Sequence, residues 1–340
     1  VVELVRDITE RAERQRELAL RNVVGMIRGA DPERAEEAVV VGAHYDHLGR
    51  GWPDVRAGNA GSIHPGADDN ASGVAVLLEL ARVLAAGPAP ARSLIFAAFT
   101  GEEAGRLGSR HYVEAAAGQG EVAEPFGMVN LDSVGRLGDG PLYVLGAGSA
   151  REWPHIFRGA GYVTGVAVEA VSEPLDASDQ VSFIQAGVPA VQLFTGAHGD
   201  YHRPTDTADQ VDAEGLVRVA AVAREAIDYL AGADGRLTPT GTRPAAGARG
   251  ESPRRVALGT VPDFAHGGEG VRLSGVSPGS PAEAAGLREG DVVVVVNGAE
   301  VGSLRGYADA LRALAPGDAV EIRYLHDGES RVARMNAVAR

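Results

Sequence analysis

Several short apolar runs in the first part of the chain are followed by polar motifs, and this recurrence restricts the fold more than any other feature. The runs have the length of buried strands and comprise residues 22–27, 38–43, 93–99, 126–131 and 190–194. Stretches with helical character separate or follow them, over residues 11–20, 72–84 and 216–230. Strands that alternate with helices predict an α/β domain, here with a mostly parallel mixed sheet flanked by helices.

The helix expected from Ser72 onward has the clearest periodicity. Its apolar residues recur at helical spacing, at Val74, Leu77, Leu78, Ala81 and Leu84. Either Asn70 or Ser72 is suited to cap its first turn.

The composition and periodicity of the sequence change after residue 231. Residues 232–254 are rich in Gly, Pro, Ala, Thr and Arg and have no periodicity, which predicts a flexible linker. We therefore expect one domain over residues 1–231 and a smaller, β-rich domain over residues 255–340. The second domain is expected to contain a helix over residues 303–313 and tight hairpin turns at Asn297-Gly298 and Asp327-Gly328.

Composition excludes several classes of function. A net charge of −14 disfavours binding to nucleic acid or to an anionic membrane surface. The chain has no cysteine, which excludes disulfides, thiolate metal sites and a cysteine nucleophile. No apolar run is long enough to span a bilayer. Because the chain begins at Val1 without a methionine, we expect it to be a processed or trimmed part of a longer precursor.

Five polar motifs are candidates for chemistry. They are His44-Tyr45-Asp46, Asp68-Asp69-Asn70, Glu102-Glu103, Asn130-Leu131-Asp132 and Asp200-Tyr201-His202. Each motif alone has an ordinary explanation as a turn, a helix cap or a solvated pair. Together they follow successive strand-like runs, and ligands of open α/β sheets gather outside the carboxyl ends of the strands. We therefore expect the motifs to converge.

The residue types indicate a metal site. Two histidines and several carboxylates without sulfur suit zinc in a hydrolytic arrangement. There are more carboxylates than one ion needs, which indicates two ions with one bridging carboxylate. The adjacent Glu102 and Glu103 suit a division between a proton acceptor and a metal ligand. Because neighbouring strand residues point to opposite faces, this pair needs a turn, which Gly101 and Gly105 allow.

These motifs resemble the signature blocks of the clan MH zinc aminopeptidases, a group that also includes glutamate carboxypeptidase-like enzymes and glutaminyl cyclases. The resemblance lies in residues 42–47, 66–73, 99–103, 129–132 and 200–206. It implies a zinc exopeptidase fold and two Zn²⁺ ions per chain. The ligands that it implies are His44 and Asp132 for one ion, Glu103 and His202 for the other, and Asp69 as the bridge, with Asp68 as the less favoured bridge.

The resemblance also implies a mechanism. Glu102 would act as the general base toward a water that bridges the two ions. Asp46 would hydrogen-bond to His44 and fix its tautomer. The implied activity is hydrolysis of N-terminal peptide bonds of peptide substrates, in a secreted, periplasmic or cell-surface protein, with the cytoplasm left open. Carboxypeptidase or glutaminyl cyclase activity on the same scaffold is an alternative, and so is an inactive scaffold.

One segment departs from the family pattern. The family often has Ser-Asp-His where this chain has Ser178-Asp179-Gln180, near the expected substrate side of the cleft. A serine hydrolase is a rival interpretation. Its Gly-x-Ser-x-Gly motif matches only residues 275–279, which we interpret as a turn in the second domain.

The second domain resembles the PDZ domains of bacterial proteases. The resemblance implies that Leu258, Gly259, Thr260 and Val261 form a carboxylate-binding loop. Domains of this type accept an extended peptide as an added strand beside a helix. A peptide or protein C-terminus is the implied partner, and a small packing domain without a free ligand is the alternative.

Overall fold

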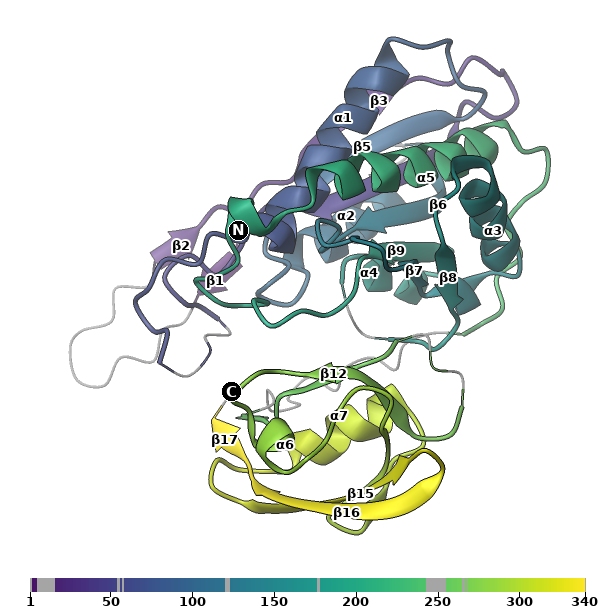
Figure 1. Cartoon of the computed structure of the whole chain (residues 1–340). Coiled ribbons are helices and arrows are strands. Elements are labelled where there is room, and N and C mark those ends of the chain that lie inside the picture. The colour runs from purple at the N-terminus through teal and green to yellow at the C-terminus, as the bar shows by residue number, and fades with distance from the viewer. Residues whose placement is uncertain are drawn as a thin grey trace.

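A computed structural model describes residues 2–4, 16–53, 56, 58–119, 123–175, 178–242, 255–264, 266 and 268–339. It contains a larger α/β unit and a smaller β-rich unit that follows it along the chain (Figure 1). A short pair of antiparallel strands, β1 (Val2–Leu4) and β2 (Arg16–Leu18), precedes the larger unit.

The larger unit is built on a seven-stranded mixed sheet in the order β3-β5-β4-β6-β9-β7-β8. The four consecutive strands β5, β4, β6 and β9 are parallel to one another, so their carboxyl ends lie at one edge of the sheet. The strands are β3 (Val23–Ile27), β4 (Glu37–His44), β5 (Ser93–Phe99), β6 (Glu124–Leu131), β7 (Leu142–Leu145), β8 (Val168–Val171) and β9 (Ala190–Phe194).

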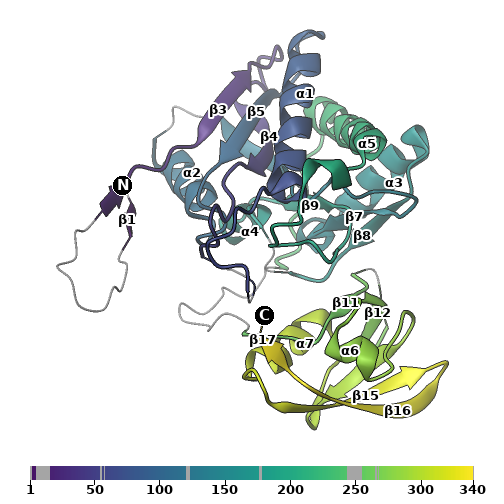
Figure 2. The same ribbon diagram turned by 60° about the vertical axis from the view of Figure 1, so that its left-hand side comes forward.

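Helices cover both faces of this sheet (Figure 2). On one face lie α1 (Gly73–Ala85), α3 (Trp153–Thr164) and α5 (Ala213–Gly232), and on the other lie α2 (Leu107–Gln119) and α4 (Gln180–Gln185). The central strand β4 shows why both layers are needed. Val39 and Val41 belong to the first core, whereas Ala38 and Val40 belong to the second, and all four are fully buried. This is the expected result when both faces of a strand are covered.

The expected strands and helices of this unit are confirmed with small shifts at their ends. The capping alternative is resolved in favour of Asn70, whose side-chain oxygen accepts the backbone N–H of Gly73 at 3.1 Å. The hydroxyl of Ser72 instead donates to the carbonyl of Asp68. Leu78 is 64% exposed, so the buried stripe of α1 is narrower than its spacing predicts.

The helix expected over residues 11–20 is wrong where the structure describes this segment. Arg16–Leu18 is a strand, β2, paired with β1. The segment has few apolar residues to anchor a helix, and pairing with β1 satisfies its backbone instead.

The beginning of the expected linker belongs to the larger unit. Leu237 is buried in its core, and Pro239 forms an isolated bridge with Ala150. Arg151 also donates its backbone N–H to the carbonyl of Thr238 at 3.1 Å. Residues 237–240 are therefore attached to the larger unit, although their composition predicts a tether. The remaining part of the expected linker, residues 243–254, lies outside the described residues.

The smaller unit is β-rich, with strands wrapped around the helix α7 (Leu304–Arg312) and the short helix α6 (Pro281–Ala284). Both expected hairpin turns are confirmed by positive φ angles, at Asn297 and Gly298 and at Asp327 and Gly328. Its strands are β10 (Val256–Ala257), β11 (Thr260–Pro262), β12 (Val271–Val276), β13 (Val292–Val296), β14 (Ala299–Glu300), β15 (Ala319–His326), β16 (Glu329–Asn336) and β17 (Val338–Ala339).

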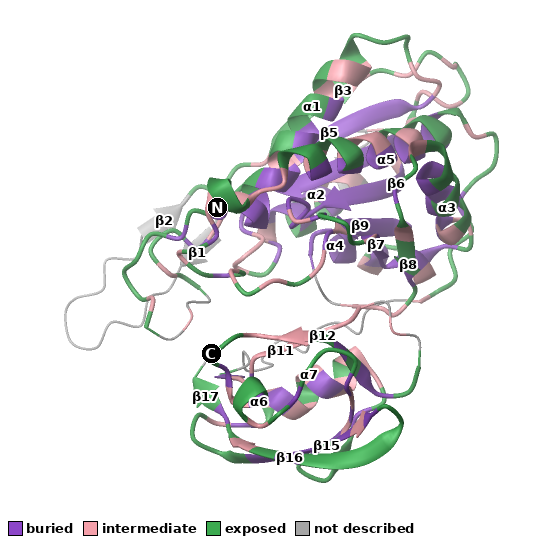
Figure 3. Ribbon diagram, in the orientation of Figure 1, coloured by how far each residue is buried: buried purple, intermediate pink, exposed green. Residues whose placement is uncertain are grey.

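Each unit has its own buried core, visible as separate purple regions in Figure 3. An aromatic contact joins them. The ring of Phe264, between β11 and β12, lies 5.4 Å from the ring of Phe194 and 6.5 Å from that of Tyr143, measured between centroids. Among the described residues, no helix combines the length and apolar character needed to cross a membrane.

Candidate metal centre

The five expected ligands converge at the carboxyl edge of the parallel strands. His44 is the last residue of β4, and Asp132 comes directly after β6. Asp69 lies in the helical turn η1 (Ala67–Ser72), which leads into α1. Glu103 follows β5 by four residues, and His202 lies in the loop after β9. The neighbouring order of these strands brings together ligands that are far apart in sequence.

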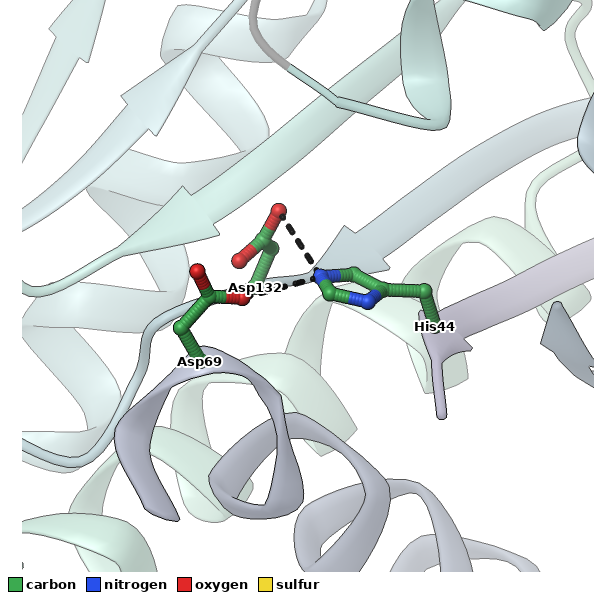
Figure 4. Close-up of side chains that lie close together, drawn as sticks. All are labelled: His44, Asp69 and Asp132. Carbon is green, nitrogen blue, oxygen red and sulfur yellow. Dashed lines mark ion pairs between the residues drawn. The ribbon is translucent and has the colours of Figure 1, made fainter. Parts of the chain in front are cut away.

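Three of the side chains form a first cluster (Figure 4). The Nε2 atom of His44 lies 3.2 Å from Oδ1 of Asp69 and 3.6 Å from Oδ2 of Asp132. His44 and Asp69 are almost fully buried, at 1% and 2% exposure. One imidazole nitrogen therefore faces two carboxylates in a site that is largely shielded from water.

A second cluster uses the other oxygen of Asp69. The Nε2 atom of His202 lies 3.3 Å from Oδ2 of Asp69 and 3.3 Å from Oε2 of Glu103. Asp69 thus directs one oxygen to each cluster, which is the arrangement required of a bridging carboxylate. Asp68 points elsewhere: its Oδ1 accepts the backbone N–H of Gly135 at 2.5 Å, and its Oδ2 lies 3.0 Å from Nε2 of His198.

The spacing of these atoms fits zinc. Zinc–nitrogen and zinc–oxygen bonds of about 2.0–2.2 Å at a tetrahedral angle separate two ligands by about 3.3–3.6 Å. The four measured separations lie between 3.2 and 3.6 Å. Imidazole nitrogens and carboxylate oxygens, without sulfur, are also the donor set of hydrolytic zinc sites. The residues present therefore fit two zinc ions that share Asp69.

Histidines and carboxylates of the cluster shift one another's pKa values. Burial alone would raise the pKa of Asp69, but contacts with His202 and His44 lower it well below its ordinary value. Burial likewise opposes the charged form of Glu103, whose pKa is nevertheless lowered by His202 and His47. Burial would lower the pKa of His44, yet Asp132 and Asp69 raise it well above the usual range. Without metal, a proton on His44 offsets part of the charge of the carboxylates, so binding zinc at this nitrogen must displace it.

Glu102 lies beside this cluster in the turn after β5. The turn has positive φ angles at Gly101, Gly105 and Arg106, and the backbone N–H groups of Gly105 and Arg106 both donate to the carbonyl of Glu102 at 2.8 Å. The turn expected from the two glycines is therefore present. Burial raises the pKa of the Glu102 carboxyl well above its ordinary value; His44 opposes this, and Asp179 adds to it.

Asp46 contacts the site differently from the expectation. The Nδ1–H of His44 donates to the backbone carbonyl of Asp46 at 3.0 Å, whereas the Asp46 carboxylate is 3.8 Å away. The carboxylate instead accepts the backbone N–H of Glu102 at 3.1 Å. The tautomer of His44 is thus fixed by main chain, because the loop after β4 curls back on the histidine. The carboxylate of Asp46 holds the turn that carries Glu102.

Comparison with known proteins agrees with this geometry. The family model described as peptidase family M28 matches residues 22–227, which is more than half of the chain. The chain belongs to peptidase family M28. A PDZ domain model matches residues 249–336 of this M28 chain, so the second unit is a PDZ domain.

Relatives of the M28 chain are named as aminopeptidases. It is 30% identical over 216 residues to aminopeptidase YwaD of Bacillus subtilis, covering 61% of this chain and 44% of the relative. It is 32% identical over 187 residues to an aminopeptidase of Pseudomonas aeruginosa, covering 52% and 31%. The chain thus spans less than half the length of either relative.

Solved structures show the same fold. A zinc aminopeptidase from Bacillus subtilis superposes with a TM-score of 0.53 and 27% identity, over 63% of this chain and 51% of that one. An aminopeptidase from Aneurinibacillus sp. strain AM-1 gives 0.52 and 28%, over 66% and 49%. A glutaminyl cyclase from an Acidobacteriales bacterium, at 0.50 and 21% identity, shares the fold.

Asp206 and Asn70 shape the M28 site through contacts that the motifs containing them do not predict. Asp206 is fully buried and accepts the backbone N–H groups of Asp68 and Asp69 at 3.0 and 3.1 Å. Its carboxylate also lies 3.5 Å from the guanidinium of Arg136. The side chain of Asn70 donates to the carbonyl of Leu131 at 2.9 Å, tying η1 to the end of β6.

The Ser178-Asp179-Gln180 segment lies against the base of the site. Ser178 accepts the side-chain amide of Asn130 at 2.9 Å, and the amide of Gln180 donates to Gln192 at 3.1 Å. Asp179 is fully buried, and the hydroxyl group of Ser109 interacts with its carboxylate. Burial raises the pKa of Asp179 to about 6; His44 and Ser109 oppose the rise, and Asp132 and Asp46 add to it. Gln180 is directed into the interior, because it is 1% exposed and its amide contacts Gln192.

The expected carboxylate-binding loop lies between β10 and β11 of the PDZ domain and extends into β11. Gly259 has a positive φ of 85°, and a Cβ there would meet the side chain of Ser280. Thr260 begins β11, and its hydroxyl is 2.7 Å from that of Tyr307 on α7. The loop and the helix thus lie side by side.

Proposed function

We propose that this chain is a zinc-dependent exopeptidase, specifically an aminopeptidase, that binds two zinc ions and hydrolyses N-terminal peptide bonds. One observation carries the proposal: the two oxygens of Asp69 face two histidines, each of which also faces a second carboxylate, at ligand spacing. His44 and Asp132 would hold one ion, and Glu103 and His202 the other. Zinc, when bound, supplies Lewis acidity that activates water and polarises a carbonyl oxygen.

Glu102 is the residue that we assign to proton transfer. It is adjacent to the proposed ligand Glu103, and Asp46 and the glycine-containing turn fix its backbone. A carboxyl whose pKa is raised by burial is better matched to accepting and releasing a proton near neutral pH. Glu102 would take a proton from the attacking water and pass it to the leaving amine.

The charge of the site favours a free amino terminus over a free carboxyl terminus. Glu102 and Asp179, which are not assigned to zinc, lie beside the ligand cluster, and burial, with Asp132 adding to it, raises the pKa of both carboxyls. Carboxylates beyond those that the zinc ions neutralise attract a substrate ammonium group and repel a substrate carboxylate. The relatives are named aminopeptidases, which agrees with a preference for a free amino terminus. The resemblance to secreted enzymes also leads us to infer a location outside the cytoplasm.

Hydrolysis of a leucine anilide by the purified chain tests the proposal. Removal of metal with a chelator should abolish release of the aniline, and added zinc should restore it. A peptide with N-terminal glutamine distinguishes hydrolysis from the glutaminyl cyclase alternative. The proposal predicts a free amino acid product, whereas ammonia and a cyclised N-terminus would contradict it.

For the PDZ domain we infer binding of a peptide or protein C-terminus at residues 258–261. Among the described residues, β11 lies at the edge of its sheet and pairs with β12, so an extended peptide can add beside it. The neighbouring helix α7 would form the other wall. Fluorescence anisotropy with labelled peptide libraries tests this inference. Binding that survives amidation of the peptide C-terminus would contradict it.

A further inference from the structure

His47 is a histidine of the metal centre that the expected ligand set leaves without a role. It lies three residues beyond the end of β4, and its side chain is 9% exposed. Its Nδ1 atom is 2.8 Å from Oε1 of Glu103 and 3.9 Å from Oδ2 of Asp69. Its ring meets that of His202 edge to face, with 5.8 Å between centroids. His47 therefore competes with His202 for the position of second-site ligand.

The separations distinguish the two histidines. Two ligands of one tetrahedral zinc lie about 3.3–3.6 Å apart, given bonds of about 2.0–2.2 Å. His202 satisfies this spacing to both of its carboxylates, at 3.3 Å each. The 2.8 Å between His47 and Glu103 is too short for two ligands of one ion and is the length of a hydrogen bond.

The two histidines also use different oxygens of Glu103. His47 contacts Oε1, and His202 faces Oε2. A donated hydrogen bond to Oε1 occupies that oxygen and orients the carboxylate plane. Oε2 is then left for the metal, so Glu103 binds through one oxygen and the site remains four-coordinate.

The position of the His47 ring is fixed by its surroundings. Gly66, with a φ of 65°, approaches so closely that a Cβ there would lie 2.6 Å from the ring atoms Cγ and Cδ2. Nε2 of His47 is buried and makes no hydrogen bond within the described part of the chain. The hydrogen bond at Nδ1 is therefore the polar contact that sets the tautomer, with the proton on Nδ1 facing Glu103.

We propose that His47 is a positioning residue of the second zinc site, which donates Nδ1–H to Glu103 and holds it as a ligand through one oxygen. This inference rests on the proposed two-zinc function. Groups that orient metal ligands typically change metal affinity 10–100-fold. His47 should therefore affect the site of Glu103 and His202 and leave that of His44 and Asp132 unchanged.

Zinc titration of the metal-free full chain against a chromogenic chelator tests the proposal without substrate. His47→Ala should lower the affinity of one site about 10–100-fold and leave the other as in the wild type. His47→Gln, which restores an N–H donor, should recover part of the loss. His64→Ala is a matched control, because His64 is a 3% exposed histidine of the same loop whose Nδ1 contacts the carbonyl of Ser62. It should leave both affinities unchanged.

Three results would overturn the proposal. One is unchanged affinity at both sites in His47→Ala. Another is complete loss of one zinc in His47→Ala with two retained in His202→Ala, which would make His47 the ligand. The third is equal weakening of both sites in His47→Ala and His47→Gln, which would indicate a general packing role. If the wild type binds two ions but cleaves no peptide, the proposed function fails while the role of His47 stands.

Discussion

Asp206 holds Asp69, the proposed bridging residue of the site, from 137 positions away: its Oδ2 accepts the backbone N–H of Asp69 at 3.1 Å. The same carboxylate accepts the N–H of Asp68 and is fully buried. The turn that contains Asp69 is thus hydrogen-bonded to the loop after β9. The same loop carries His202, four residues before Asp206. Both halves of the proposed second site depend on this contact.

Replacing Asp206 with alanine should destabilise the protein even without metal. Two buried backbone N–H groups lose their acceptor, and each unsatisfied group costs about 1–3 kcal/mol. We expect the free energy of unfolding of the zinc-free chain to fall by at least about 2 kcal/mol in Asp206→Ala. Asp206→Asn, which retains one acceptor oxygen, should lose less. Urea denaturation measures both, and a change below about 0.5 kcal/mol in Asp206→Ala would contradict this role.

Asp69→Asn should lose more metal than any other single ligand change. Its two oxygens face different histidines, and an amide supplies only one oxygen. Elemental analysis after dialysis should show close to no zinc in Asp69→Asn and one ion in His44→Ala or His202→Ala. As much zinc in Asp69→Asn as in the wild type would show that the sites do not share this residue.

Glu102→Gln should retain both metal ions but lose turnover. The amide keeps the shape of the side chain and cannot accept a proton, and a general base contributes about 10²–10⁴-fold in rate. Steady-state kinetics on a leucine anilide, together with metal analysis, separates this outcome from loss of a ligand. A kcat near that of the wild type would move the assignment to another carboxylate.

The buried carboxyl of Asp179 should make stability depend on pH. Burial raises its pKa to about 6, well above the ordinary value of an aspartate, so the folded state binds the proton more tightly than the unfolded state. Its contribution is most favourable below about pH 4 and is lost as the pH rises toward about 6. Relative to the wild type, zinc-free Asp179→Asn should gain stability over this range, on the order of 2 kcal/mol by pH 7. Parallel stability curves for the two proteins would contradict the assignment.

Removing the PDZ domain should leave small-substrate activity intact if the cut follows residue 242. A cut at Gly232 would remove Leu237 from the core and should lower stability. The proposed metal ligands all lie before residue 203, which favours an independent active site. The PDZ domain could still influence the active site through the contact of Phe264 with Phe194, because Phe194 ends the strand that leads to His202.

Phe264→Ala in the full chain isolates that contact. We expect unchanged kcat/KM on a leucine anilide for Phe264→Ala and for the chain that ends at residue 242. A large fall in both, with zinc still bound, would show that the PDZ domain helps to shape the active site.

The sequence allowed prediction of those parts of the site that directly follow strands. His44 and Asp132 lie at the ends of buried apolar runs, so pattern and position coincide. Asp206 and His47 lie in loops, where no periodicity indicates which way a side chain points. Their roles become visible only when contacts distant in sequence are known, such as that between Asp206 and Asp69.

Two errors of the sequence analysis have a common cause. Composition alone predicted a linker from residue 232, but Leu237 is buried in the core of the larger unit. The charged, helix-like pattern alone predicted a helix over residues 11–20, yet Arg16–Leu18 pairs as a strand. In both segments tertiary partners, which local patterns do not encode, decided the conformation.

The central claim, aminopeptidase action at a two-zinc site, is tested most directly by acetylating the substrate. The measurement is kcat/KM of the zinc-loaded chain on a leucyl peptide and on the same peptide with an acetylated N-terminus. The carboxylates around the site should recognise the free ammonium group, so we predict that acetylation reduces kcat/KM at least about 100-fold, which corresponds to about 2.7 kcal/mol. Equal rates on the two peptides would contradict the claim.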